Sequence, residues 1–482
     1  MLNLSKRDWW PIGLFAVHLT QAFLFAGWYP ESLYDPDLLA YFGYFRGWVE
    51  HDAALQGCTY FIPKPLLVFI LGPLGNVRWA FACSAVASAL LGSLAYLIGR
   101  DCFGRMAGVL FSAFLLLDPT KTVLTLNSSA DLYVGLFLLW AVYLSTVKHP
   151  ARASACLLLS ALVKPVTLPC ALHVLTTDTR GTKRWIWLLV PMLAIPLTLL
   201  SNQALLGSAL GSDKSLMQFA TLRDGSAIQP GEVLHFALWR QLVRSRFVST
   251  APWGFLGVLL WVARDRRRLT SPVLLIPILF LSGYVGLSLV SPYMPFFRFF
   301  WPVEVWFLGF LIFGMLEAAR QLAGGRAWVR AAVSCLLLFF LADDSLARQL
   351  RYRDHFALPF ERSMAFVSSS REALRNESAP GEHVLTPMTF LPYLAWELPA
   401  DGHGKLIAAE QAALDGSTAR PEWILDVPDI YLSQAARDLV ARLVRQGQYE
   451  VRLTDGTAAL LRRAASRSQP PGSMPGPASS QL

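Results

Sequence analysis

The sequence predicts a multi-pass α-helical membrane protein with about 11 crossings and a small external α/β domain in its C-terminal part. Of the 482 residues, 54% are hydrophobic and only 16% are charged, whereas a soluble domain averages about 25% charged residues. The mean hydropathy is +0.42. Long apolar runs recur along the chain, which is typical of proteins that span a membrane many times.

The basic residues set the predicted orientation. Lys and Arg together number 42, against 33 Asp and Glu, and they gather in short loops that the positive-inside rule places in the cytoplasm. The N-terminus is therefore expected inside and the C-terminal domain outside. The first run lacks a persuasive cleavage site and is expected to remain as an anchor. Single spans are expected at about 9–28, 79–98, 106–117, 131–147, 185–206, 251–263, 272–290, 299–317 and 329–342, and the segment 118–131 is expected to be an external loop.

Two further crossings come from one broken run, 153–176. A single crossing there would place the basic stretch 176–184 outside, against the charge rule. Lys164-Pro165 lies in the middle of the run, and a chain that turns back there crosses and re-crosses, which leaves the basic stretch inside. Broken helices at membrane depth are tolerated where they line a cavity. Two interpretations of Lys164 then remain. It is either a lysine at a helix end that extends to the membrane interface or a cation that lines the cavity, and we favour the first.

The first external loop, 29–62, leads into the most unusual stretch of the chain. Asp35-Pro36-Asp37 has the form of a helix start, with a capping Asp, Pro at the first helical position and an acid in the first turn. The helix that follows, roughly 36–50, is too short to span and has a broad aromatic face. We therefore expect it to lie along the membrane interface.

Two acids and a lysine in this stretch are candidates for chemistry. Asp35 and Asp37 are explained by helix capping, and the same geometry favours an ionised carboxylate that accepts a proton from an attacking hydroxyl. Lys64, between two prolines, is either a snorkelling lysine or an ammonium that binds a lipid-linked phosphate. The residues alone leave both interpretations open.

Two further candidates lie beside later spans. Asp131 follows Asn127-Ser128-Ser129 and is either a helix cap or a substrate ligand. Arg298, among aromatic residues at a membrane boundary, either snorkels or contacts a phosphate. Glu304 is a weaker candidate for a buried partner in the same helix.

The composition from residue 343 onward changes to charged and mixed, and it predicts an external α/β domain over 343–464. Helices alternating with short strand-like runs are typical of such a domain. The tail 465–482 is rich in Pro, Ser and Gly and is expected to be disordered. Helices are expected at 359–375 and 432–446, and strands at 383–388, 405–409, 422–427, 449–453 and 458–463.

Several function classes are disfavoured. The sequence has no Walker A, GxGxxG, HExxH or GxSxG motif, and its basic residues lie in loops rather than in a nucleic-acid-binding motif. Only Cys58 of the six cysteines falls in an expected external loop, so no external disulfide framework is expected.

The order of four motifs resembles the GT-C superfamily of polyprenyl-phosphate-dependent glycosyltransferases, especially the branch with the protein mannosyltransferases and the aminoarabinose transferase of lipid A. Asp37-Leu-Leu-Ala-Tyr41, followed by Phe45-Arg46-Gly47, is similar to the family's Asp-Glu-x-x-Tyr run. Lys64-Pro65-Leu66 is similar to its Lys-Pro-Pro-Leu. The segment 127–133 resembles the stretch before the fourth helix, and Phe297-Arg298-Phe299 with Pro302 resembles the late Arg-aromatic-x-x-Pro element. The resemblance covers about 1–342. It departs from the family at Leu38, where a Glu is usual, and at Leu66, where a second Pro is usual.

The resemblance implies an inverting sugar transfer outside the cytoplasm, from a polyprenyl-phosphate sugar to a lipid, glycan or protein acceptor. Asp37 is the implied general base. Asp35, Lys64, Asp131 and Arg298 are implied to bind substrate, with Lys64 and Arg298 at the phosphate. No cofactor is obligatory. Some relatives use a divalent metal and others do not; Asp35 with Asp37 could hold one, although two carboxylates make a poor cage. Membrane lipids are expected partners and nucleic acids are not.

Two other functions fit part of the pattern. A lipid or glycan transporter or flippase also has broken helices and intramembrane charges, but this chain has no internal repeat and its largest charged cluster lies in a surface loop. A non-catalytic assembly factor with a partner-binding external domain is the third alternative. Loss of activity in Asp37→Asn separates an enzyme from both.

Overall fold

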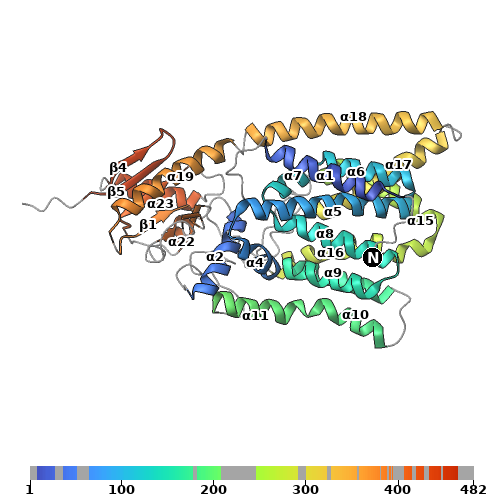
Figure 1. Cartoon of the computed structure of the whole chain (residues 1–482), viewed down its shortest axis with the longest axis horizontal. Coiled ribbons are helices and arrows are strands. Elements are labelled where there is room, and N and C mark those ends of the chain that lie inside the picture. Colours follow the sequence, from blue (N-terminus) through green and yellow to red (C-terminus); the bar gives the residue numbers. More distant parts are fainter. Residues whose placement is uncertain are drawn as a thin grey trace, which may run out of the picture.

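The larger part of the molecule is a bundle of helices, most of which run along its long axis (Figure 1). The structure is a computed structural model, and it describes residues 8–27, 36–51, 64–176, 182–207, 246–290, 300–322, 327–354, 358–379, 381–387, 390–391, 393–394, 406–414, 420–427, 434–446 and 449–464. The bundle elements are α1 (Trp10–Ala26), α2 (Pro36–Glu50), α4 (Pro65–Leu71), the 3₁₀ turn η1 (Gly72–Leu74), α5 (Val77–Phe103), α6 (Arg105–Leu117), α7 (Pro119–Leu126), α8 (Ala130–Thr146), α9 (Pro150–Val163), the 3₁₀ segment η2 (Pro165–Thr176), α10 (Thr182–Met192), α11 (Ala194–Leu206), α15 (Arg246–Arg264), the 3₁₀ turn η3 (Arg266–Thr270), α16 (Pro272–Val290), α17 (Trp301–Leu322) and α18 (Ala327–Tyr352).

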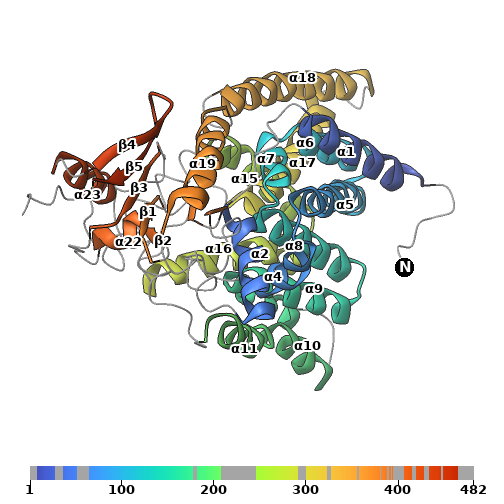
Figure 2. The same cartoon turned by 60° about the vertical axis from the view of Figure 1, so that its left-hand side comes forward.

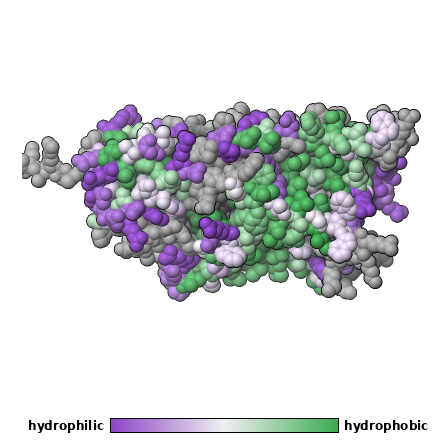
Figure 3. All heavy atoms as spheres, turned by 45° about the horizontal axis from the view of Figure 1, so that its top comes forward, coloured by the Kyte–Doolittle hydropathy of each residue, from purple (hydrophilic) through white to green (hydrophobic). Residues whose placement is uncertain are grey.

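The helix lengths fit a membrane protein. Among the described residues, three helices are long and apolar enough to cross a membrane: α5, the continuous segment Arg184–Leu206, and Trp301–Gln321 of α17. The helices α6 and α7 pass the same test as a pair bent by 57°, a geometry that fits a broken span or a re-entrant loop. On the face drawn in Figure 3, apolar side chains gather over the helical part and hydrophilic ones over the C-terminal part. The expected count of about 11 crossings is not settled by these lengths and stays a prediction.

The reversal expected at Lys164-Pro165 is confirmed. The Lys164 ammonium contacts Asp131, in the first turn of α8. Nine residues later, the ring of His173 contacts the Ser145 hydroxyl, which lies in the last turn of α8, with 2.9 Å between Nε2 and Oγ. Because α9 follows directly on the end of α8, the segment η2 must run back alongside α9.

One expectation about the external side was wrong, and another stays a prediction. The stretch expected as an external loop, 118–131, contains the helix α7, and Lys121 in that helix is only 1% exposed. The helix α2 has the expected bounds, and Tyr41 and Tyr44 are each 1% exposed. Their rings join the core of the bundle, together with Phe42, and the interfacial position of the helix stays a prediction.

The C-terminal part contains a five-stranded sheet with the strand order β2-β1-β3-β5-β4. The strand β1 is parallel to β2 and β3, and β5 is antiparallel to β3 and β4. All five expected strands and both expected helices are present. The helix α18 is longer than expected and continues past residue 342. The elements are α19 (Leu358–Glu377), β1 (Val384–Thr386), β2 (Leu406–Ala408), α22 (Ala409–Leu414), β3 (Trp423–Asp426), α23 (Gln434–Arg445), β4 (Tyr449–Thr454) and β5 (Ala459–Arg463).

Helices cover both faces of this sheet (Figure 2). The helix α19 packs on one face, and α22 and α23 pack on the other. Tyr393, in the segment after β1, packs against the core under α19 and also against the core of the helix bundle. The sheet therefore adjoins the bundle on the side where the chain leaves β1.

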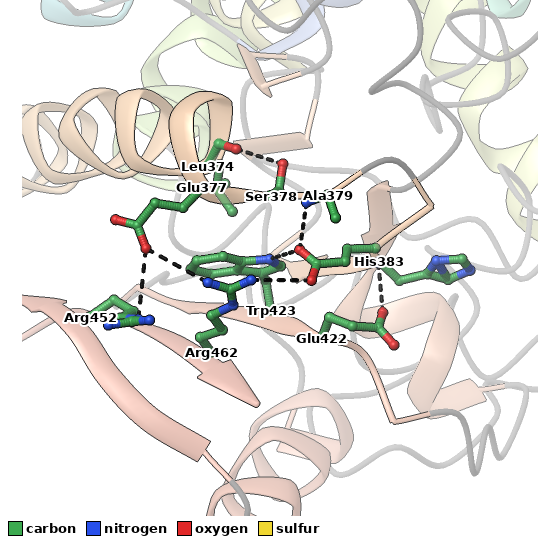
Figure 4. Close-up of polar contacts among 10 residues, drawn as sticks. Leu374, Glu377, Ser378, Ala379, His383, Glu422, Trp423, Arg452 and Arg462 are labelled. Carbon is green, nitrogen blue, oxygen red and sulfur yellow. Dashed lines mark hydrogen bonds and ion pairs between the residues drawn. The ribbon is translucent and has the colours of Figure 1, made fainter. Parts of the chain in front are cut away.

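Polar contacts around Trp423 tie α19 to the sheet (Figure 4). The Trp423 indole N–H donates to Glu382 across 2.7 Å, and the Arg462 guanidinium lies 4.9 Å from the centre of the indole ring. Arg462 also contacts Glu382 at 3.4 Å, and Arg452 pairs with Glu377 at 3.7 Å. Since Trp423 is fully buried, these charges close over one edge of the apolar core.

Candidate functional site

Lys64 is fixed against the helix α2. Its ammonium donates to the Tyr41 hydroxyl across 2.9 Å and lies 5.4 Å from the centre of the Tyr41 ring. Lys64 has an extended backbone and immediately precedes Pro65, the first residue of α4. Proline is favoured at a first helical position and disfavours helical backbone in the residue before it. The Lys-Pro pair thus starts α4 and leaves the lysine outside the helix, where it is partly buried.

Asp131 and Lys164 form a buried ion pair. Their side chains are 3% and 11% exposed, and the Lys164 Nζ lies 2.5 Å from Asp131 Oδ1. The cap of α8 is Ser129, whose hydroxyl accepts from the Asp131 N–H. Asp131 therefore is not the helix cap, and the Lys164 side chain is buried against an acid instead of extending to solvent as we favoured.

The start of α8 lies at the same end of the bundle as α2 and α4 (Figure 1). Ser84, in the second turn of α5, is 3.0 Å from the hydroxyl of Tyr133, which follows Asp131 by two residues. The helix α5 begins only three residues after η1, the turn that continues α4. The Lys64 and Asp131 contacts thus belong to one end of the bundle.

The other predicted site residues are described only in part. Asp37 lies in the first turn of α2, and its side chain is outside the described part of the structure. Asp35 and Arg298 lie wholly outside it. Glu304, the weaker candidate, is partly buried in α17. The structure therefore brings Asp131 together with Lys164, and leaves the roles predicted for Asp35, Asp37 and Arg298 as predictions.

The sequence analysis missed a buried polar network behind α7. The Lys121 ammonium contacts His18 Nδ1 at 2.7 Å, and His18 Nε2 contacts the Ser112 hydroxyl at 3.1 Å. Lys121 also donates to the Gln21 side chain across 3.2 Å. Both ring nitrogens of His18 are thus engaged, one by Lys121 and the other by Ser112. The only sequence signal was a lysine within an apolar stretch, which we had assigned to a loop.

Part of this network provides hydrogen bonds to groups at the break between α6 and α7. The Gln21 side chain donates to the backbone carbonyl of Leu116, which loses its helical partner where α6 ends before Pro119. Asp118, at the break, caps α7 and accepts from the Trp301 indole N–H across 2.6 Å. Backbone groups at a break within a membrane must be satisfied by neighbouring protein. The helix α1 does so here through Gln21, and α17 supplies a donor to the Asp118 side chain that caps α7.

No group of three or more His, Cys, Asp or Glu side chains suited to a metal ion occurs among the described residues. The carboxylates of Asp35 and Asp37, the candidate metal ligands, are outside that set. The arrangement that is described offers an ammonium at Lys64 and a neutralised pair at Asp131, and neither is a metal cage.

Comparison with known proteins identifies the fold. No protein-family model matches the chain, and no curated protein matches it. Crystal structures of ArnT from Cupriavidus metallidurans, one bound to undecaprenyl phosphate and one in the apo state, each align with 95% of this chain and 98% of that chain, with a TM-score of 0.51 and 16% sequence identity. The apo oligosaccharyltransferase of Archaeoglobus fulgidus aligns with 83% of this chain and 65% of that chain at a TM-score of 0.46 and 13% identity, too low to add to the argument. The chain is a membrane protein with the fold of the GT-C glycosyltransferases.

Proposed function

We propose that the protein is a GT-C membrane glycosyltransferase that moves a hexosyl or pentosyl group from a polyprenyl-phosphate donor to an acceptor outside the cytoplasm. The observation that carries the proposal is the Lys64–Tyr41 contact, in a chain with the GT-C fold. Tyr41 follows Asp37 by four residues in α2. Positions four apart lie on the same face of a helix, one turn from each other. A fixed cation is thus set against the helix face that carries the proposed base.

The chemistry needs a base and a cation at opposite ends of one displacement. The acceptor oxygen or nitrogen attacks the anomeric carbon of the donor, and Asp37 takes the acceptor's proton. The bond between the anomeric carbon and the phosphate oxygen breaks, and the polyprenyl phosphate leaves with the electron pair, which inverts the configuration. Lys64 stabilises the charge that grows on the phosphate, with Arg298 as a second contact.

The other predicted residues complete the proposal. Asp35 and Asp131 bind substrate, and the Lys164 ammonium keeps Asp131 from standing as an unpaired buried charge. The N-terminus is cytoplasmic, the domain 343–464 is extracytoplasmic, and the protein acts in the cell envelope. The undecaprenyl phosphate bound to ArnT supports a polyprenyl donor. A mannosyltransferase-like specificity is one form of the proposal.

The test is transfer in reconstituted membranes. Labelled polyprenyl-phosphate sugars are supplied in turn, and release of sugar to membrane, protein or water is followed. We expect Asp37→Asn to lower turnover by about 10²-fold or more with donor binding retained, and Lys64→Met to lower it by about 10²–10³-fold. Asp101→Asn and Lys148→Met, which change exposed residues, are the matched controls.

Two results would contradict the proposal. Absence of binding to every polyprenyl phosphate would exclude this donor class and favour a transporter. Wild-type turnover in Asp37→Asn would remove the proposed base.

A further inference from the structure

Two polar side chains in the turn between α7 and α8 have no hydrogen-bond partner in the described part of the structure. These are Asn127, through its side-chain oxygen, and Ser128, through its hydroxyl, and both atoms are buried. Ser128 as a whole is 2% exposed. A buried polar group without a partner is costly, and native proteins rarely retain one without a reason. A ligand that is not part of the protein chain is one such reason.

The backbone of this turn is satisfied, so its geometry does not account for the two side chains. The Ser128 N–H donates to the carbonyl of Thr125 at 3.2 Å, and the Ser129 N–H donates to that of Leu124 at 2.9 Å. The Ser129 hydroxyl caps α8. These bonds cap the C-terminus of α7 through the backbone alone, so the side chains of Asn127 and Ser128 have no capping task comparable to that of the Ser129 side chain.

Ser128 also holds a strained backbone. Its φ is 50°, in the left-handed region that side chains other than those of Gly, Asn and Asp seldom adopt. This conformation belongs to the C-terminal cap of α7, in which the residue after the cap is left-handed and its N–H and the next one bond to the last carbonyls of the helix. The cap fixes Ser128 in place through its backbone and gives its hydroxyl no partner.

The turn lies beside the proposed active site. Asp131, three residues after Ser128, carries the ion pair with Lys164, and Tyr133 joins this end of α8 to the start of α5. This is the end of the bundle where Lys64 contacts α2.

We infer that Asn127 and Ser128 bind hydroxyl groups of the sugar that the donor carries. This inference rests on the proposed function and names the part of the substrate that these residues recognise. An unpaired acceptor such as the Asn127 oxygen needs a donor of a hydrogen bond, which an ionised phosphate lacks and a sugar hydroxyl has. A hydroxyl also accepts, so it suits Ser128 in either role. The charges of Asp131 and Lys164 offset each other, so the site is suited to a neutral polyhydroxyl group.

The test compares binding of sugar-bearing and sugar-free lipids by the full-length protein. The variants are Asn127→Ala and Ser128→Ala, and the probes are polyprenyl-phosphate sugars and the same polyprenyl phosphate without sugar. Each variant is expected to raise the Kd and the KM of the sugar-bearing donor by about threefold to tenfold, the loss of one hydrogen bond. The Kd of the sugar-free lipid should not change. Deoxy-sugar donors should identify the hydroxyl, because the analogue that lacks it is insensitive to the variant.

Two controls distinguish a defect in sugar binding from misfolding and from the loss of any buried hydroxyl. Ser154→Ala removes another buried hydroxyl without a partner, ten residues before Lys164 on α9, and should leave donor binding unchanged. Ser128→Gly removes the hydroxyl and relieves the strained backbone, so it should fold at least as well as wild type and keep the binding defect.

The results that overturn the inference are distinct from those that overturn the proposed function. Equal affinities of wild type and variants for every sugar, with ordered water on Asn127 and Ser128 in an experimental map, would show that water and not sugar fills this role. An equal loss for sugar-free lipid would assign the turn to the phosphate. Failure of wild type to transfer any sugar would refute the proposed function, while the two binding measurements would still decide the inference.

Discussion

Removing one partner of the Asp131–Lys164 pair should destabilise the protein much more than removing both. At 2.5 Å and an effective dielectric constant of about 20, the gross attraction is about 7 kcal/mol. Desolvation of the two ions offsets most of it, so the net value of the pair is small. Lys164→Met removes the paired cation from the buried Asp131 carboxylate, and such losses are typically about 3–5 kcal/mol. Asp131→Asn removes the paired carboxylate from the Lys164 ammonium at a similar cost.

The assay is equilibrium unfolding in detergent micelles, followed by the fluorescence of the 16 tryptophans. Wild type, the two single variants and the double variant form a double-mutant cycle. We expect the double variant to lose no more stability than either single variant, because no buried charge is left alone. Losses that simply add, or single losses below about 1 kcal/mol, would show that the pair is solvated and would refute the burial argument.

Three further outcomes follow from other contacts. Gly257→Ala should lower the thermal midpoint or prevent folding, because the added Cβ would overlap the backbone carbonyl of Phe310, and thermal unfolding checks it. Trp301→Phe should cost about 1–3 kcal/mol, since it leaves buried Asp118 without its indole donor, and the denaturation midpoint measures it. Burial works to raise the pKa of Glu382, but its hydrogen bonds and the nearby guanidinium outweigh this and lower the pKa. The stability that this carboxylate gives is thus present above its unfolded-state pKa and lost as the pH falls through the lowered value, and Glu382→Gln should flatten that acid loss in a pH series.

The sequence predicted elements wherever the signal was local. Asp35-Pro36-Asp37 marked the start of α2, and the helix begins at Pro36 as expected, because a proline favours the first helical position through its own geometry. The strands near the C-terminus were found at their expected places for the same reason, since short β-branched and aromatic runs between turns are local signals. The reversal at Lys164 was found from the charge of the next loop.

What the sequence did not predict depends on tertiary packing. The aromatic row of α2 fits a helix at a membrane surface and a helix buried in a bundle equally well, because both environments are apolar. Lys121 and Lys164 were assigned to a loop and to the interface, since a lone lysine is usually solvated. Their partners, His18 and Asp131, lie 103 and 33 residues away in the chain. No local pattern indicates such pairs.

Some polar side chains in the interior of the bundle are needed by the fold, because they bond to backbone groups where a helix is broken. Where α6 ends, Gln21 serves the Leu116 carbonyl, and where α9 ends, the Thr167 hydroxyl donates to the Lys164 carbonyl across 3.0 Å. Gln21 thus pairs a carbonyl that a straight helix would have paired itself, and the Thr167 hydroxyl adds a second bond to a carbonyl that already accepts from the Thr167 N–H. A polar residue in the interior of this bundle is therefore not in itself a sign of a binding site. The hydroxyl of Ser128 is buried and serves no backbone group in the described structure, and it lies three residues from Asp131 of the proposed site, where a substrate hydroxyl would give it a partner.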